Sequence, residues 1–327
     1  MKHHWGDLLS REQGYWKMVP NRERYAYRLD SYSADDPSAE ILTIMGEDKE
    51  WKKAFSFPSL KELTLHEPTK EQLEGLAQLT CIERLRITHA RPKTFDFIRS
   101  MTNLKELVLE YVSGCSDLSP LCSLNGLEAL HFENLRRVSS FEFLKGLTEL
   151  KYLHIDGTFD WKQPIENFDF LRELTMLEHF SLGNIITPTP YPATLPALEL
   201  KNLKYIKIPP NIFILDEYAL LEVGLDNVDG ASWPAIKKWS YAFIEKGKYY
   251  CLTQDEIQNK HPEVIIRDGK EIIADADSER YAFLGKGERG VKCKSKQAEQ
   301  KCQCHFDKYE AKKTAAKDML VKQNNSS

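Results

Sequence analysis

The sequence predicts an α/β fold in which one short unit is repeated into a curved solenoid, with a cap at each end. Three observations predict this fold: an apolar motif that recurs at nearly constant spacing, an apolar helical segment before several copies, and a change of sequence style outside the repeats. A single unit of this kind cannot bury its apolar stripe alone, but stacked units share one continuous core.

The repeated motif has the spacing L-x-x-L-x-L and recurs between residues 60 and 208 of the 327-residue chain. Successive copies begin 22, 22, 23, 23, 27 and 26 residues apart, and a weaker copy, Ala39-Leu42-Ile44, begins 21 residues before the first. Side chains alternate between the two faces of a strand, so each copy predicts a short strand with its apolar residues inward. The clear copies are Leu60-Leu63-Leu65, Ile82-Leu85-Ile87, Leu104-Leu107-Leu109, Leu127-Leu130-Phe132, Leu150-Leu153-Ile155, Leu177-Phe180-Leu182 and Leu203-Ile206-Ile208.

Apolar segments precede several of these strands, at residues 95–104, 141–150 and 168–177. Their apolar residues keep a three-residue spacing, as in Phe95 and Ile98, which is typical of the inner face of a helix. The variant at 117–127 carries Pro120 where a helix or 3₁₀ turn would begin, a position that proline tolerates. The unit is therefore a strand, a turn and a helical return, with parallel strands on the concave side and the bulkier segments on the convex side.

The strings LKELTL, IERLRI, LKELVL and LKYLHI, with phrases such as FEFLKGLTEL before them, resemble leucine-rich repeats of the short 22-residue, bacterial and cytoplasmic type. The resemblance covers about residues 39–210. It implies a curved leucine-rich-repeat solenoid with a parallel concave sheet and a short helical convex side, and a concave face that binds proteins. The family usually places Asn or Cys three positions after the last motif leucine, but this chain has Pro68, Ala90, Val112, Leu135, Thr158, Ile185 and Asn211 there. This departure argues against the large extracellular receptors of the family, but not against the fold.

Four parts of the chain are expected: an N-terminal cap (1–38), the solenoid (39–210), a small α+β unit that caps the last repeat (211–290) and a basic, partly disordered tail with cysteines (291–327). The cap contains apolar and aromatic residues that could shield the first repeat, namely Trp5, Leu8, Leu9, Tyr15, Trp16, Tyr25 and Tyr27. Two β-branched runs around Asp268-Gly269 predict a type I′ hairpin over residues 264–274. The longer spacings are attributed to insertions at 159–167 and 186–198, expected as loops at the edge of the solenoid.

Composition restricts the function. With 42% hydrophobic residues the chain can form a core, and a net charge of −4 argues against nucleic acid as the main partner. Neither a secretory signal nor a run of about 20 apolar residues is present in the sequence, so no membrane association is expected. Seven cysteines, an odd number, favour a reduced cytoplasmic protein, which we expect to be monomeric.

The residues between the motif leucines are expected to point to solvent on the concave face. His131 and His154 occupy the same position in neighbouring repeats, with Glu133 and Asp156 beside them, which allows a metal site or a histidine–acid catalytic pair. A polar face that binds a protein, with tyrosines as anchors, is the favoured interpretation. The predicted partner-binding residues are Arg84, Arg86, Glu106, Glu110, His131, Glu133, Tyr152, His154, Asp156, His179 and Tyr205.

Two motifs near the C-terminus require interpretation. Residues 285–290 match G-x-G-x-x-G, but a dinucleotide site needs an apolar helix directly afterwards, and residues 291–305 have no such pattern. Four possible zinc ligands lie within 13 residues, but two of the cysteines are separated by one residue instead of two to four, so free cysteines are favoured over zinc. These possible ligands are Cys293, Cys302, Cys304 and His305. Residues 285–327 have eleven Lys/Arg against five Asp/Glu, which favours a solvated basic helix.

The leading hypothesis is a non-enzymatic protein–protein interaction module that binds a protein on its concave face. The alternative is a metal- or nucleic-acid-responsive regulatory protein that uses the basic Cys/His tail. A third possibility, an enzyme that uses the histidine–acid cluster, is disfavoured because the sequence has no nucleophile motif or phosphate loop. No cofactor is expected, with zinc at the tail as the exception to test.

Overall fold

A computed structural model describes residues 8–10, 17–19, 27–31, 38–244, 248–253, 264–267, 270–274 and 279–324. The chain divides into two compact units. Unit 1 comprises residues 1–209 with 227–230, and unit 2 comprises residues 210–226 with 231–327.

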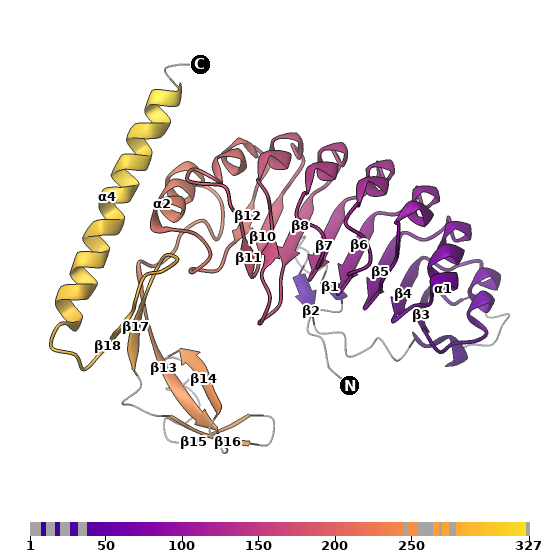
Figure 1. Cartoon of the computed structure of the whole chain (residues 1–327), viewed down its shortest axis with the longest axis horizontal. Helices are drawn as coiled ribbons and strands as arrows, with labels where there is room; N and C mark the ends of the chain where they lie inside the picture. Colours follow the sequence, from indigo (N-terminus) through magenta and orange to yellow (C-terminus); the bar gives the residue numbers. More distant parts are fainter. Residues whose placement is uncertain are drawn as a thin grey trace. The chain divides into compact units, whose positions relative to one another are not determined.

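Unit 1 is built on an eight-stranded parallel sheet with the strand order β12-β10-β8-β7-β6-β5-β4-β3, so chain neighbours are sheet neighbours (Figure 1). Motif leucines of adjacent strands lie opposite each other, as Leu107 does with Leu130. The predicted repeat solenoid is therefore confirmed, and the weak first copy forms β3. The strands are β3 (Ile41–Met45), β4 (Glu62–His66), β5 (Arg84–Thr88), β6 (Glu106–Glu110), β7 (Ala129–Glu133), β8 (Tyr152–Asp156), β10 (His179–Leu182) and β12 (Tyr205–Lys207).

The core of unit 1 is the stack of inward-facing motif residues. Leu107, Leu130 and Leu153 are completely buried. Burying a leucine side chain contributes about 1.5–3 kcal/mol relative to leaving it exposed, so the repeated leucines supply much of the stability of the solenoid. Each repeat contacts only its neighbours in the stack.

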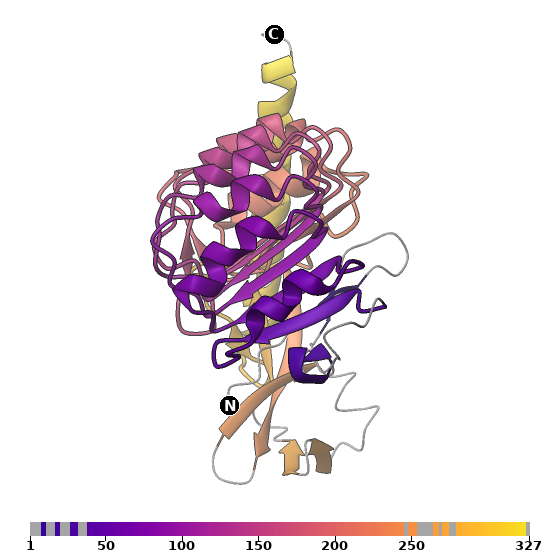
Figure 2. The same cartoon turned by 90° about the vertical axis from the view of Figure 1, so that its right-hand side faces the viewer.

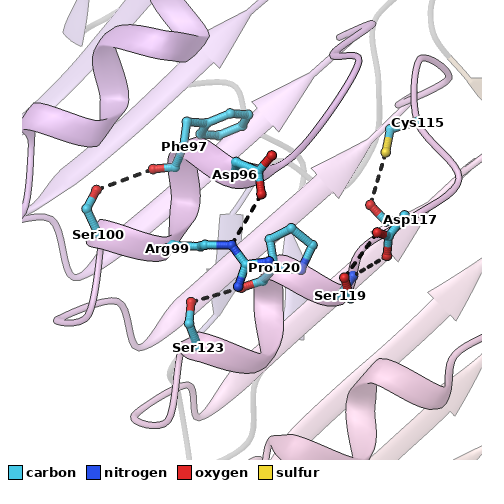
Figure 3. A network of polar contacts seen from close by, with 9 residues as sticks. All are labelled: Asp96, Phe97, Arg99, Ser100, Cys115, Asp117, Ser119, Pro120 and Ser123. Carbon is cyan, nitrogen blue, oxygen red and sulfur yellow. Dashed lines mark hydrogen bonds and ion pairs between the residues drawn. The ribbon is translucent and has the colours of Figure 1, made fainter.

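The predicted helical returns are short 3₁₀ helices along the side of the sheet opposite the concave face (Figure 2). Figure 3 shows how local side chains complete their turns: Asp117 accepts hydrogen bonds from the backbone N–H and the hydroxyl of Ser119, and Ser123 donates to the carbonyl of Pro120. Pro120 lies in the first turn, as its position in the sequence predicts. The 3₁₀ helices of the repeats are Trp51–Ser56, Leu76–Gln78, Asp96–Ser100, Ser119–Ser123, Glu142–Gly146, Asp169–Glu173 and Leu195–Glu199, and α1 (Lys70–Gly75) directly precedes the second. A further 3₁₀ helix, Leu29–Ser31, precedes β3.

The residue after each of four strands has a left-handed backbone conformation. Glu67, His89, Tyr111 and Asn134 have φ between 50 and 56°. Each of their N–H groups donates to a carbonyl at the end of the next strand, for example from His89 to Glu110 at 2.9 Å. The left-handed residue thus turns the chain away from the sheet while extending the hydrogen-bond ladder by one step.

Two buried glutamines bind turn backbone where the asparagine ladder would be expected. Gln163 is completely buried. Its Oε1 accepts from the N–H of Leu135 at 2.9 Å and its Nε2 donates to the carbonyl of Val138 at 2.7 Å. Gln72 donates to the carbonyl of Met45 at 2.9 Å. The missing ladder is therefore replaced at these turns by side chains from other parts of the repeat.

Gln163 lies in the first insertion, which is not a loop throughout. Its short strand β9 (Gln163–Pro164) pairs in parallel with β11 (Ile185–Ile186). The expectation of two plain loops is wrong to this extent, because the extra residues extend the chain far enough to form a second small sheet.

Near the N-terminus, β1 (Leu8–Ser10) and β2 (Lys17–Val19) pair antiparallel. Arg28 forms an isolated bridge with Thr43 of β3, and Leu29 is buried. Residues 27–31 thus adjoin the first strand. The expected cap residues Trp5, Tyr15, Trp16 and Tyr25 lie outside the described part of the chain, so capping by residues 1–38 stays a prediction.

Unit 2 is a small α+β unit, as predicted. Its antiparallel sheet has the order β15-β16-β13-β17-β18, and β14 also pairs with β13. The predicted hairpin over 264–274 is present, since Arg267 pairs with Lys270; its turn residues lie outside the described ones. Residues 285–290 connect β17 to the antiparallel strand β18, a connection unlike the βαβ unit of a dinucleotide site. The elements are α2 (Leu215–Gly224), β13 (Ile236–Ile244), β14 (Lys248–Thr253), β15 (Val264–Arg267), β16 (Lys270–Ala274), β17 (Arg280–Phe283), β18 (Val291–Lys292) and α4 (Ala298–Asn324).

The basic tail differs from the expectation of a separate, partly disordered segment. Residues 298–324 form α4, which packs against α2 within unit 2. The hydroxyl of Tyr309 donates to Glu222 at 2.6 Å, and Lys312 pairs with Asp216 at 2.7 Å. The buried residues of α4 follow a 7-4-7 spacing on one face, but most are small or polar, so the sequence shows little apolar periodicity. They are Ala298, His305, Tyr309 and Ala316.

Candidate binding face and metal-ligand cluster

Side chains between the motif leucines form three ladders across the concave side of the sheet, which we call the ladder face. Parallel strands lie about 4.8 Å apart, so residues in the same register are neighbours. The first ladder is Glu62, Arg84, Glu106, Ala129, Tyr152, His179 and Tyr205; the second is Thr64, Arg86, Val108, His131, His154, Ser181 and Lys207; the third is His66, Thr88, Glu110, Glu133 and Asp156.

The expected exposure of this face is wrong for most of its residues. The reason is visible in the ladders, where neighbouring rings and ion pairs cover one another. Partly exposed are Glu62, Arg84, Glu133, His154, Asp156 and Tyr205, and Lys207 is exposed. Buried among the predicted binding residues are Arg86, Glu106, Glu110, His131, Tyr152 and His179.

Aromatic rings contact one another in a tilted arrangement along the first ladder. The ring centroids of Tyr152 and His179 are 4.6 Å apart, and those of His179 and Tyr205 are 4.7 Å apart. Tyr152 is only 2% exposed and packs with Val108 and Ala129 in a small apolar cluster. Burial raises the pKa of Tyr152, and burial followed by the charge of His154 lowers the pKa of His179 to about 4. Tyr152 is therefore part of the packed sheet surface, whereas Tyr205 retains exposed area.

Ion pairs join the strands β4, β5 and β6. Arg84 donates to Glu62 at 3.2 Å and to Glu106 at 3.0 Å. Arg86 pairs with Glu110, and both side chains are buried. Removing one partner of a buried pair is costly because it leaves an uncompensated charge. These arginines therefore link neighbouring strands of the sheet through ion pairs.

Two histidines and three carboxylates meet on β6, β7 and β8. His131 and His154 stack with ring centroids 4.3 Å apart, and Nδ1 of His154 lies 2.8 Å from the hydroxyl of Ser181. Burial lowers the pKa of His131 well below its usual value. Burial, followed by the charge of Glu110, raises the pKa of Glu133 to about 8.

One ligand atom each from Glu110, His131 and Glu133 lies within 4.8 Å of the others. The sequence interpretation placed Glu133 and Asp156 beside the histidines but did not include Glu110 in the cluster. The sequence could have placed Glu110 in this cluster, because Glu110 and Glu133 occupy the same position in neighbouring repeats.

Within the part of the chain that the structure describes, the predicted C-terminal zinc ligands do not form a group of three or more ligand atoms within reach of one ion, although burial, followed by the charge of nearby Cys293, raises the pKa of the Cys302 thiol. Cys302 and Cys304 are two residues apart on α4, which corresponds to a rotation of about 200° around the helix axis. Their side chains therefore point to nearly opposite sides of the helix. His305 is buried against Phe283, with ring centroids 4.6 Å apart. The potential metal-binding group found in the described residues is the one on β6 and β7, and it includes none of Cys293, Cys302, Cys304 and His305.

Sequence reasoning expected a loop after β8 but did not single out the exposed aromatic residue in it. Phe159 is fully exposed, and its neighbour Trp161 stacks under the guanidinium of Arg136 at 5.3 Å. An aromatic residue in an insertion is a weak signal, because it can as well be buried.

No protein-family model and no curated protein matches the chain. Solved structures with a similar fold include an internalin of Listeria monocytogenes, 19% identical, with 67% of this chain and 64% of that chain covered at a TM-score of 0.40. Internalin C2 of the same organism is 19% identical, with coverages of 51% and 71% and a TM-score of 0.36. A leucine-rich-repeat protein of Leptospira interrogans is 16% identical, with 59% of both chains covered and a TM-score of 0.33. This chain thus spans less than two thirds of the first of these proteins.

A search of the described helices finds none with the length and hydrophobicity needed to cross a membrane. The recurrent L-x-x-L-x-L motif, the parallel sheet with one strand per motif and the 3₁₀ returns together give this chain the leucine-rich-repeat fold.

Proposed function

We propose that this protein is a non-enzymatic, monomeric, cytoplasmic interaction module that binds a protein partner on the ladder face, at the end formed by β8, β10 and β12. One observation carries the proposal. The row of contacting rings on the first ladder ends in the partly exposed Tyr205, two residues from the exposed Lys207.

Stacking suits Tyr205 to act as an anchor. A ring already held against His179 loses little conformational freedom when a partner covers it, and this loss is a main cost of forming an interface. Tyrosine is also among the residues whose truncation most weakens interfaces. We therefore propose Tyr205 as the anchor in place of Tyr152, because Tyr152 is buried.

Charge around this end favours orientation of the partner. Lys207 is exposed, and the carboxylate of Asp156 is 32% exposed two strands away. Exposed charges of opposite sign steer encounter and orientation more than they add affinity. In this proposal the ion pair of Arg86 and Glu110 does not contact the protein partner, because both side chains are buried. Its role is to link β5 to β6.

Affinity capture from the native lysate tests the proposal, with Tyr205→Ala/Lys207→Glu as the variant. Met176→Ala/Lys201→Glu is the matched control, since both residues are exposed in turns that precede strands. Wild type and control should retain a protein that the variant loses by at least about tenfold, the effect of 1.4 kcal/mol. Equal capture by all three, with circular dichroism showing intact folds, would contradict the proposal.

A further inference from the structure

Three side chains with metal-ligand chemistry converge at the ends of β6 and β7. Glu110 and Glu133 end these strands and lie opposite each other in register. His131 precedes Glu133 by two residues, so it points to the same face of the sheet. One nitrogen or oxygen from each lies within 4.8 Å of the other two, close enough for one ion to contact all three.

The buried imidazole of His131 provides an independent observation. Its side chain is 2% exposed, and among the described residues neither Nδ1 nor Nε2 has a hydrogen-bond partner. A neutral imidazole has one donor and one acceptor, and leaving a buried polar atom without a partner is energetically unfavourable. A metal ion bound to one ring nitrogen would remove part of this cost.

Neighbouring groups hold the three side chains in place. The ring of His131 stacks on His154, which is fixed in turn by Ser181. Tyr111 hydrogen-bonds to the carboxylate of Glu133. Arg86 binds Glu110 through Oε2, and a carboxylate has two oxygens. Such supporting contacts orient the ligands of protein metal sites.

The charge of the surrounding region also favours a cation. Glu110, Glu133 and Asp156 place three carboxyl groups beside a single guanidinium, that of Arg86. Because acidic side chains outnumber basic ones here, a bound cation would be favoured over an anion.

We propose that Glu110, His131 and Glu133 bind one divalent first-row transition metal ion, of which Zn²⁺ is the test case. One imidazole nitrogen with two carboxylate oxygens is a ligand set suited to zinc, cobalt or manganese, whereas calcium and magnesium take oxygen ligands. The site does not depend on the protein partner proposed for β8, β10 and β12.

Isothermal titration of EDTA-treated full-length protein with ZnCl₂ tests the site. The background carries His3→Ala/His4→Ala and Cys293→Ser/Cys302→Ser/Cys304→Ser, which removes the adjacent histidines near the N-terminus and the clustered cysteines near the C-terminus. We expect one equivalent to bind with a Kd of 10 μM or tighter. His131→Phe, which keeps the stacked ring, and Glu133→Gln should each weaken binding at least about 30-fold. His66→Phe, on another strand of the same sheet, should not.

X-ray absorption at the zinc edge supplies a readout that needs no substituted ligand. Wild-type protein with one equivalent of zinc should show nitrogen and oxygen neighbours with the scattering of a single imidazole. A shell of sulfur neighbours would assign the zinc to the cysteines and overturn the proposal. Unchanged affinity in His131→Phe, or no binding at 1 mM zinc, would overturn it as well.

Discussion

The substitution Gln163→Met tests whether a buried glutamine replaces the asparagine ladder in the turns. Methionine keeps the length of the side chain but removes both the acceptor for Leu135 N–H and the donor to Val138 C=O. Both backbone groups belong to residues that are 2% exposed or less. Each group left without a partner costs about 1–3 kcal/mol, so the two together should cost unit 1 roughly 2–6 kcal/mol.

Urea denaturation followed by circular dichroism measures the global effect, and amide hydrogen exchange at Leu135 measures the local one. For a unit of this size, at about 2–4 °C per kcal/mol, the loss corresponds to a fall in Tm of roughly 4–24 °C. The same substitution at the exposed neighbour, Lys162→Met, should change stability by less than about 0.5 kcal/mol. If Gln163→Met were as stable as this control, with Leu135 still protected from exchange, the proposed role of Gln163 would be refuted.

Three further predictions concern the ladder face. Tyr152→Ala should lower the free energy of unfolding by about 3–5 kcal/mol in chemical denaturation, because it opens a cavity beside the Val108 cluster, while Tyr152→Phe should stay within about 1 kcal/mol. The pKa of His179 is about 4, below the 6.5 of an unfolded histidine, so wild type should lose roughly 3 kcal/mol as the pH falls from 6.5 to 4. His179→Phe should show a shallower loss in urea titrations at pH 7 and 4.5, and an identical slope would refute this linkage. Arg86→Met should destabilise by about 3–5 kcal/mol, and Arg86→Met/Glu110→Leu should recover most of that loss in the same assay.

The repeat fold was predictable because its cause is local. The same apolar spacing returns in every unit, and Leu107, Leu130 and Leu153 are buried for the same reason. Even the weak copy at residues 39–44 forms a strand, because stacking on β4 completes its hydrogen bonds. The hairpin at 264–274 and the 3₁₀ turn at Pro120 were predictable from two or three residues each.

The burial of the ladder face was not predictable from alternation alone. Alternation states which side of the sheet carries Tyr152, but not that His179 would cover its ring. The contribution of Gln163 was hidden for a similar reason, since it lies 28 residues from the N–H that it binds. The packing of helix α4 against α2 was missed because the buried face of α4 is mostly small and polar. In each case the deciding contact joins side chains of different elements, and the spacing of the motif leucines does not describe such contacts.

Photo-crosslinking in intact cells tests most directly the claim that the ladder face binds a protein. Benzoylphenylalanine would replace Lys207 on the face or, as control, Lys201 in the turn before β12. The account predicts one discrete protein adduct from position 207 that disappears in the Tyr205→Ala background, and none from position 201. Adducts of equal yield at both positions, or none at position 207, would contradict it.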